Sequence, residues 1–170
     1  MKKRPELLAP AGDLERLKIA LLYGADAVYI GGPLLNLRAN AINFTFEEIK
    51  EACDFAHSLN KKVYVTVNTL IYDTEVERFI KYIDFLHSNN VDAVIMQDIG
   101  MIDLVRKTYP NLEIHASTQL HIHNLEGVKL CSELGLKRAV LSRETPIELI
   151  KEIKNNTDIE LEIFIHGALC

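Results

Sequence analysis

Short apolar runs alternate with helix-like segments along the whole chain, and this alternation restricts the fold more than any other feature. Seven runs are predicted to be strands: 6–9, 27–30, 62–67, 93–96, 113–116, 138–141 and 160–165. Between them, apolar residues recur every three or four positions, as in an amphipathic helix. One such set is Val76, Phe79, Ile80, Ile83 and Leu86. Apolar strands joined by helices indicate a parallel sheet covered by helices.

The predicted helices have recognisable ends. Three Thr-x-x-Glu sequences fit a capping box, in which the threonine side chain and the glutamate side chain each accept a backbone N–H. They are Thr45 with Glu48, Thr74 with Glu77, and Thr145 with Glu148. Pro146 suits the first helical position, where its missing N–H is harmless, and Gly24 suits the end of the first helix. Segments 24–30, 90–96 and 135–141 echo one another weakly, each as a helix end that leads into a buried strand.

Two architectures fit this alternation, a doubly wound sheet and a (β/α)8 TIM-type barrel. The first predicted turn, residues 10–13, lacks the G-x-G-x-x-G of a dinucleotide-binding sheet. Polar residues follow nearly every strand, which favours the barrel, since a barrel builds its site from all its carboxyl strand ends. A complete barrel has eight strands and about 250 residues. We therefore expect residues 1–170 to form an N-terminal barrel domain that stops after strand seven, with open edges through which the chain could self-associate.

Composition narrows the class of protein. Hydrophobic residues make up 48% and charged residues 25%, an ordinary globular balance. The net charge of -5 argues against a dedicated nucleic-acid-binding module, although a local basic patch stays compatible with it. No apolar run reaches the roughly 20 residues that span a bilayer, so we expect a cytoplasmic protein with no membrane partner. Cys53 and Cys131 fall within predicted helices and are interpreted as core residues.

The polar residues after the strands are the candidate site. Asn68, Gln97, Ser117 and Gln119 are predicted to bind substrate, and Asp98, Arg143, Glu144, Glu162 and His166 are candidates for catalysis. Structural alternatives exist for several of them. Asp98 and Ser117 could cap helices, Glu144 could pair with Arg143, and Ser117 and Gln119 share a face only if their strand continues.

Three further observations complete the set of candidates. Glu162 is expected to point into the barrel, where Arg143 or Arg38 would balance its charge. His121 and His123 resemble a metal pair but are better explained as a solvated loop. Cys170 is a possible thiolate ligand or nucleophile, with the alternative that it is a small hydrophobic residue of a loop.

Six segments together resemble the collagenase-like peptidase family, peptidase family U32. They are 5–13 (PELLAPAGD), 24–32 (GADAVYIGG), 43–45 (NFT), 115–119 (HASTQ), 141–144 (LSRE) and 166–170 (HGALC). The resemblance implies a barrel-type N-terminal domain. It also implies one of two activities: cleavage of collagen-like or other peptides, or oxygen-independent hydroxylation of a tRNA or rRNA base or of a quinone precursor.

The hydroxylases of this family bind an iron–sulfur cluster through four cysteines, and Cys170 matches the first of them. Cys53 and Cys131 match none of the other three, so the resemblance assigns the cluster to a full-length parent rather than to these 170 residues alone. We carry forward three hypotheses: an iron–sulfur-dependent hydroxylase, a peptidase, and a non-catalytic truncated barrel that self-associates. No nucleophile–base pair at a known protease spacing supports the peptidase independently.

Overall fold

The computed structural model describes residues 4–37 and 43–167. Its strands are β1 (Leu8–Pro10), β2 (Ala27–Gly31), β3 (Lys62–Val67), β4 (Ala93–Met96), β5 (Glu113–Ala116), β6 (Arg138–Val140) and β7 (Glu160–Glu162). Its α-helices are α1 (Leu14–Leu22), α2 (Phe46–Ser58), α3 (Val76–Ser88), α4 (Ile99–Thr108), α5 (Leu125–Glu133) and α6 (Ile147–Asn155). Two 3₁₀ turns, η1 (Asp73–Glu75) and η2 (Thr118–Leu120), complete the described elements.

The strand order decides between the two architectures. The order in the sheet is β1-β2-β3-β4-β5-β6-β7, the same as the order in the sequence. In a doubly wound sheet the order in which strands are added reverses at a switch point, so the spatial order of the strands differs from their order in the sequence. The β1–β2, β2–β3, β5–β6 and β6–β7 pairs are parallel. The fold is therefore that of a (β/α) barrel, as predicted, with seven strands.

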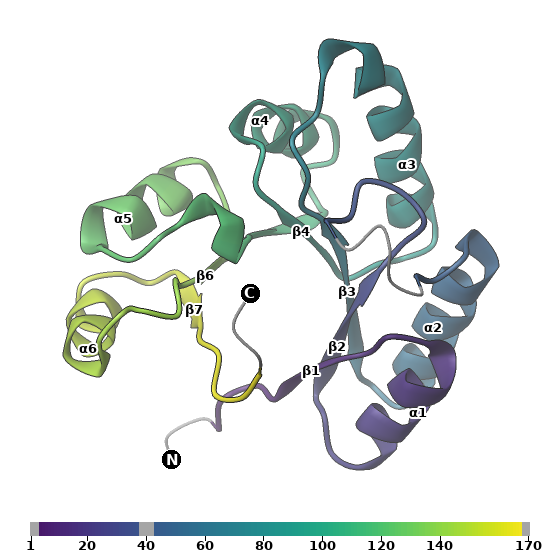
Figure 1. Ribbon diagram of the computed structural model, residues 1–170, viewed down its shortest axis with the longest axis horizontal. Coiled ribbons are helices and arrows are strands. Elements are labelled where there is room, and N and C mark those ends of the chain that lie inside the picture. The colour runs from purple at the N-terminus through teal and green to yellow at the C-terminus, as the bar shows by residue number, and fades with distance from the viewer. Residues whose placement is uncertain (1–3, 38–42, 168–170) are drawn as a thin grey trace. The chain divides into compact units, whose positions relative to one another are not determined.

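The chain divides into two compact units, Met1–Ile95 and Met96–Cys170. In the first unit, α1, α2 and α3 lie on one side of their strands, and in the second unit α5 and α6 do the same (Figure 1). Each unit thus repeats the strand–helix alternation that the sequence predicts. Within the described part of the chain, no helix combines the length and the apolar character needed to cross a membrane.

Strand boundaries agree with the sequence to within one residue except at the two terminal strands, with β2 one residue longer and β6 one residue shorter than predicted. The bounds of β3, β4 and β5 are those predicted. The first strand is shifted to Leu8–Pro10, and the last ends at Glu162 instead of residue 165. The register explains the shorter β7, because Glu162 pairs with Val140, where β6 ends. Residues 163–165 therefore lie beyond the end of β6 and have no β6 residue with which to pair.

One of the three predicted capping boxes is confirmed, at Thr45 and Glu48 of α2. The prediction for Thr74 is wrong, because Thr74 lies inside η1 and α3 begins at Val76 without a side-chain cap. The prediction for Thr145 is also wrong. Pro146 occupies the N-cap of α6 instead of the first helical position, and the helix has no side-chain cap.

The core of the first unit is built from alternating strand positions. Ala27, Tyr64, Ala93 and Ile95 form one buried cluster, with Leu8 and Tyr29 packed against it. The opposite face of β3 buries Val63, Val65 and Val67. In α3, Phe79, Ile83 and Leu86 are buried as predicted, whereas Ile80 is 37% exposed and Tyr82 takes its place on the apolar face.

The weak internal echo corresponds to one repeated hydrogen bond. At each equivalent position the backbone N–H donates to a carbonyl near the start of the preceding strand. The pairs are Asp26 to Leu7 at 2.8 Å, Asp92 to Val63 at 3.1 Å, and Lys137 to Ile114 at 2.9 Å. In the first two copies, the aspartate side chain also accepts a backbone N–H, from Leu7 and from Val63 respectively. The Asp-Ala-Val sequence is therefore a structural motif at the starts of β2 and β4, and the third copy shares only the backbone hydrogen bond of Lys137.

Asp26 gives this motif a measurable pH dependence. The Leu7 N–H at 2.9 Å holds the pKa of Asp26 below its ordinary value of 3.8, and Arg4 and Lys61 act in the same direction. A carboxyl with a depressed folded-state pKa adds stability above its unfolded pKa and loses it as the pH falls through the folded pKa. We expect Asp26→Asn to lower the free energy of unfolding by about 1.5 kcal/mol at neutral pH.

Denaturant titrations at neutral pH and at a pH well below 3.8, under the folded-state pKa of Asp26, would measure this difference. The gap between the wild type and Asp26→Asn should close in the acidic series, because both then lack the charge. A gap of the same size at both pH values would show that the carboxylate charge of Asp26 plays no part.

Candidate functional site

The first unit places three asparagines near the carboxyl ends of β2 and β3. Asn36 Nδ2 donates to Asn43 Oδ1 at 2.7 Å, and Asn68 Oδ1 accepts the Leu37 N–H at 3.3 Å. Asn36 is buried and Asn68 is half-buried. Of these, the sequence predicted only Asn68. The bonds join the β2–α2 connection to the end of β3, so they depend on tertiary structure that no local pattern shows.

Gly31 makes room for this group. A Cβ at that position would collide with Asn36 Nδ2 and would lie 2.8 Å from Asn43 Oδ1. A glycine that directly follows an apolar strand is a signal of close approach, and the Gly31-Gly32 pair is the feature from which Asn36 and Asn43 could have been found.

In the second unit, Gln97 and Asp98 follow β4 and are half-buried. Asp98 Oδ1 accepts the Met101 N–H at 3.1 Å and so caps α4, which is the structural alternative that the sequence left open. Ser117 caps η2, accepting the Gln119 N–H at 3.2 Å. Because β5 ends at Ala116 and η2 begins at Thr118, the strand does not continue. The strand alternation that would align Ser117 with Gln119 is therefore absent.

Glu162 lies at the end of β7 and is paired with an arginine that sequence reasoning did not propose. Arg138 Nη1 donates to Glu162 Oε2 at 3.4 Å, and Arg138 Nη2 donates to Glu160 Oε2 at 2.7 Å. Arg138 is buried. The β6–β7 register sets Arg138 beside Glu160, so Arg138 is a partner that sequence reasoning missed, while the pairing of Glu162 with Arg143 stays a prediction. Arg38 lies outside the described residues.

Arg143 instead lies over an aromatic ring. Its guanidinium carbon is 4.3 Å from the centroid of the Phe164 ring, which is typical of a cation–π contact. Arg143 follows β6 and Phe164 follows β7, so both belong to the carboxyl ends of neighbouring strands. Glu144, the next residue, is exposed. Sequence reasoning found Arg143 and Glu144 but missed Phe164, which it assigned to the strand.

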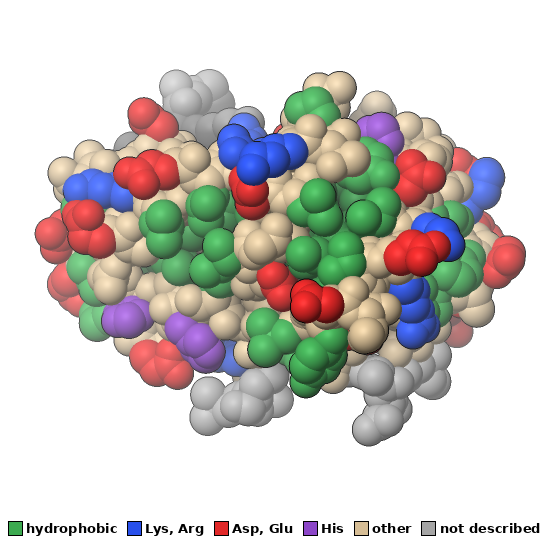
Figure 2. All heavy atoms as spheres, turned by 90° about the horizontal axis from the view of Figure 1, so that it is seen from above, with side chains coloured by type: hydrophobic (Ala, Val, Ile, Leu, Met, Phe, Trp, Pro, Cys, Tyr) green, Lys and Arg blue, Asp and Glu red, His purple; other side chains and the backbone are tan. Residues whose placement is uncertain are grey.

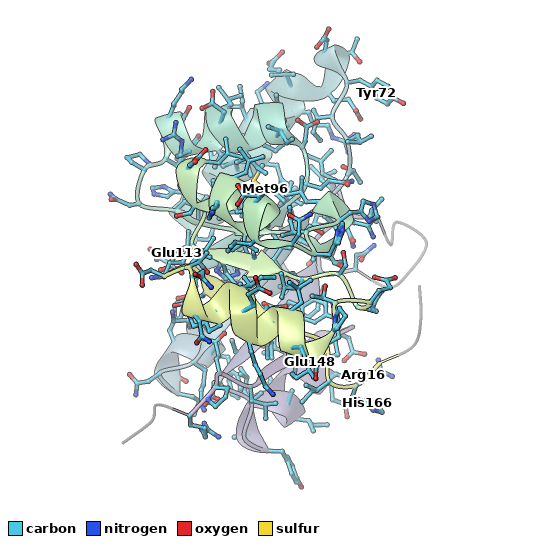
Figure 3. The ribbon with its side chains drawn as sticks, turned by 90° about the vertical axis from the view of Figure 1, so that its left-hand side faces the viewer. Arg16, Tyr72, Met96, Glu113, Glu148 and His166 are labelled. Carbon is cyan, nitrogen blue, oxygen red and sulfur yellow. The ribbon has the colours of Figure 1, made fainter. Side chains whose placement is uncertain are left out.

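His166 is exposed in the segment after β7. It lies toward the same end of the second unit as Glu148 of α6, with Glu113 at the start of β5 toward the opposite end (Figure 3). His121 and His123 are exposed, as expected for a solvated loop. Cys170 lies outside the described residues, so its candidacy as a ligand stays a prediction.

The other two cysteines are core residues, as predicted. Cys53 and Cys131 are almost fully buried in α2 and α5. Burial raises the pKa of Cys53 to about 12, and burial also raises the pKa of Cys131. Thiols with raised pKa values are poor nucleophiles and poor metal ligands. Among residues 4–37 and 43–167, no three His, Cys, Asp or Glu side chains are grouped so that they could hold a metal ion.

The described surface carries no strong field of one sign on the face shown in Figure 2, where acidic and basic side chains are interspersed with apolar ones. This agrees with the 24 acidic and 19 basic residues of the sequence. On that face, a contact with a polyanion would have to involve single basic side chains rather than a basic patch.

Comparisons of the chain with known proteins identify a matching family. The model of peptidase family U32 matches residues 12–170. The tRNA hydroxylation protein P1 of Bacillus subtilis is 48% identical over 99% of this chain, and a 23S rRNA 5-hydroxycytidine synthase of Escherichia coli is 44% identical over 98%. A collagenase of Porphyromonas gingivalis is 33% identical over 97%. The chain spans 40%, 25% and 42% of these relatives' own lengths.

Solved structures support the fold. The structure of a U32 peptidase superposes with a TM-score of 0.75, covering 96% of this chain and 70% of that one, at 14% identity. A 2,3-dimethylmalate lyase superposes with a TM-score of 0.66, covering 97% of this chain and 69% of the lyase, also at 14% identity. At such low identities these likenesses concern the architecture alone.

Proposed function

Because the chain belongs to peptidase family U32, we propose that it forms the barrel part of an enzyme that hydroxylates a base of tRNA or rRNA. The observation that carries this proposal is that most of the similar relatives are named for RNA hydroxylation. They share 42–48% of their residues with the chain over nearly its whole length. An uncharacterized protease of Methanocaldococcus jannaschii shares 47%, and the collagenase shares 33%. A tRNA or rRNA substrate is also consistent with the cytoplasmic location that we expect for the protein.

The chemistry of the candidate site supports a nucleobase as substrate. Within each unit, amides and hydroxyls lie near the strand ends: Asn68 in the first unit, and Gln97 and Ser117 in the second. Such groups both donate and accept hydrogen bonds, and so match the mixed donors and acceptors on the edge of a base. A quinone precursor offers fewer donors, which makes it the weaker substrate candidate.

The iron–sulfur cluster is part of this proposal, but the described residues do not fit it. Four thiolates usually hold such a cluster, whereas Cys53 and Cys131 are buried in separate helices with raised pKa values. Cys170 is the one cysteine of the chain left for this role. The remaining ligands would have to come from beyond these 170 residues, so we derive no reaction step from the cluster.

A peptidase is the second candidate, favoured by the name of the collagenase relative. Hydrolysis through a thiol would need a cysteine with a lowered pKa, and both described cysteines have the opposite shift. Self-association through an open sheet edge also stays a prediction. A relative named as an uncharacterized protease is 47% identical and also favours the peptidase, but more of the similar relatives are named for RNA hydroxylation.

We expect Cys170→Ala in the whole enzyme to abolish both the cluster absorbance and the hydroxylated base. Removing one thiolate of four destabilises the bound cluster. The measurements are visible absorbance after anaerobic reconstitution and mass spectrometry of nucleosides from cells that carry each variant. Cys131→Ala is the matched control, since it removes a buried thiol from the core and should keep both signals.

Hydroxylation that persists in Cys170→Ala would exclude the cluster assignment. Cells that lack the gene but keep a full level of hydroxylated base would exclude the proposed function itself. Cleavage of gelatin by the highly purified enzyme, lost together with Cys170 and His166, would establish the peptidase instead.

A further inference from the structure

Arg143 and Phe164 form a fixed pair at one end of the second unit. β6 ends at Val140 and β7 ends at Glu162, and these two residues are register partners. Arg143 follows three residues after one strand end, and Phe164 two residues after the other. The guanidinium stacks on the ring, with its carbon 4.3 Å from the ring centroid. The contact restricts the rotamers of the long arginine side chain, whose N–H donors lie in the plane of the guanidinium.

The turn that carries Arg143 leads directly into a helix with an uncapped start. α6 begins at Ile147, four residues after Arg143, and Pro146 at its N-cap offers no side-chain acceptor. The positive end of the helix dipole lies there. Thr145, in the same turn, has a buried hydroxyl for which the described residues provide no hydrogen-bond partner. Arg143 and the start of α6 are both groups that hydrogen-bond to an anion, whereas the Thr145 hydroxyl is too buried to reach a ligand at the surface.

The side chains around this turn determine which kind of anion could bind there. Glu144 and Glu148 are exposed beside this turn, and their charges disfavour a ligand with two or more negative charges. Ile163, Phe164 and Ile165 are 42%, 37% and 81% exposed, so an apolar strip borders the arginine. A free phosphate dianion has no apolar part that could contact this strip. A nucleotide within an RNA strand has one negative charge, and its flat base or its ribose could cover the apolar strip.

We propose that the turn 143–147, with Arg143 held on Phe164, binds a backbone phosphodiester of the RNA substrate. This inference rests on the proposed function, because RNA is the substrate that it assigns. Arg143 donates to the phosphate oxygens, the start of α6 faces the same charge, and the exposed side chains of Ile163 and Ile165 contact the adjoining nucleoside. Phe164 is a positioning residue, since it acts on the phosphate through the orientation of Arg143.

Binding of a fluorescein-labelled single-stranded RNA of about 12 nucleotides, followed by anisotropy across a salt series, tests the proposal. Arg143→Ala should weaken binding about tenfold. It should also lower the slope of log K against log salt by about 0.7, the share of one phosphate contact on a single strand. Arg143→Lys should keep the slope but lose affinity, because lysine keeps the charge and loses the planar fork.

A double-mutant cycle separates positioning from folding. Phe164→Leu should weaken RNA binding several-fold in the wild type and have no effect in the Arg143→Ala background. Arg106→Ala is the control for charge, because Arg106 lies in the last turn of α4 and pairs with Asp103. That variant should leave the slope unchanged. Thermal melts of each variant establish that it is folded.

Three results would overturn the inference. The first is equal RNA affinity of the wild type and Arg143→Ala, and the second is no RNA binding by the wild type. The third is displacement of the RNA by inorganic phosphate as readily as by unlabelled RNA, which would assign the turn to free phosphate. The proposed function is decided separately, by nucleoside analysis of cells without the gene, so each can fail without the other.

Discussion

Replacing Arg138 by methionine is expected to lower the free energy of unfolding by about 2–3 kcal/mol. Arg138 donates to Glu160 through Nη2 at 2.7 Å and Nε at 3.1 Å, and to Glu162 through Nη1 at 3.4 Å. The Arg138 side chain is only 9% exposed, and that of Glu162 is 17% exposed. Methionine fills similar space but leaves the Glu162 carboxylate without this partner, and a buried charge that loses its partner is strongly destabilising.

Urea denaturation of the wild type and of the variants measures this loss. Arg138→Met combined with Glu160→Gln and Glu162→Gln should regain much of the stability, since no carboxylate then lacks its cation. Glu160→Gln alone should have a smaller effect than Arg138→Met, because the Glu160 side chain is 45% exposed and water screens it. Equal stability of the wild type and Arg138→Met would mean that water already balances both carboxylates.

The ion pairs of Arg138 with Glu160 and Glu162 are also expected to affect the proposed RNA contact. Arg138 joins the first residues of β6 and β7, and the far ends of these two short strands lead to Arg143 and Phe164. A three-residue strand has few ladder hydrogen bonds of its own, so side-chain pairs contribute much to its register. Loss of Arg138 should therefore weaken RNA binding together with stability, whereas loss of Arg143 should weaken RNA binding alone.

The fold could be predicted because its signal is local and periodic. The bounds of β3 and β4 follow from runs rich in apolar and β-branched residues between helices, and a parallel sheet buries such strands on both faces. The carboxyl-end position of the polar residues follows from strand direction alone. The Asp-Ala-Val echo was visible in the sequence, although its hydrogen bonds to Leu7 and Val63 were not.

What sequence reasoning missed depends on contacts between distant segments. The pairing of Glu162 with Arg138 follows from the β6–β7 register, which the sequence does not specify, so Arg143 was proposed and Arg138 was missed. Thr145 has the residue type and spacing of a cap, yet the turn buries its hydroxyl before α6 begins. Asn36 and Asn43 meet only because Gly31 leaves them room. A functional site is assembled from such contacts, which is why its residues are harder to predict than its fold.

Gly32→Ala is expected to lower the free energy of unfolding by about 2–3 kcal/mol, the range of strong overpacking. A Cβ at Gly32 would collide with the Tyr82 hydroxyl, and would lie 3.1 Å from Tyr82 Cζ and 3.2 Å from Ile49 Cδ1. Tyr82 and Ile49 are fully buried and cannot move aside into solvent. The strain would arise directly after β2, next to Gly31 and the asparagine group, so the variant also tests how firmly that group is held.

A second substitution should relieve the first. Tyr82→Phe removes a buried hydroxyl that has no hydrogen-bond partner among the described residues, and whose burial raises its pKa. Alone, it should leave the stability unchanged or raise it by up to about 1 kcal/mol, since no hydrogen bond is lost. In the Tyr82→Phe background the nearest atom to the new methyl group is Cζ, so Gly32→Ala should cost at least 1 kcal/mol less. Purely additive effects of the two substitutions in urea denaturation would show that the backbone, and not the hydroxyl, opposes a side chain at residue 32.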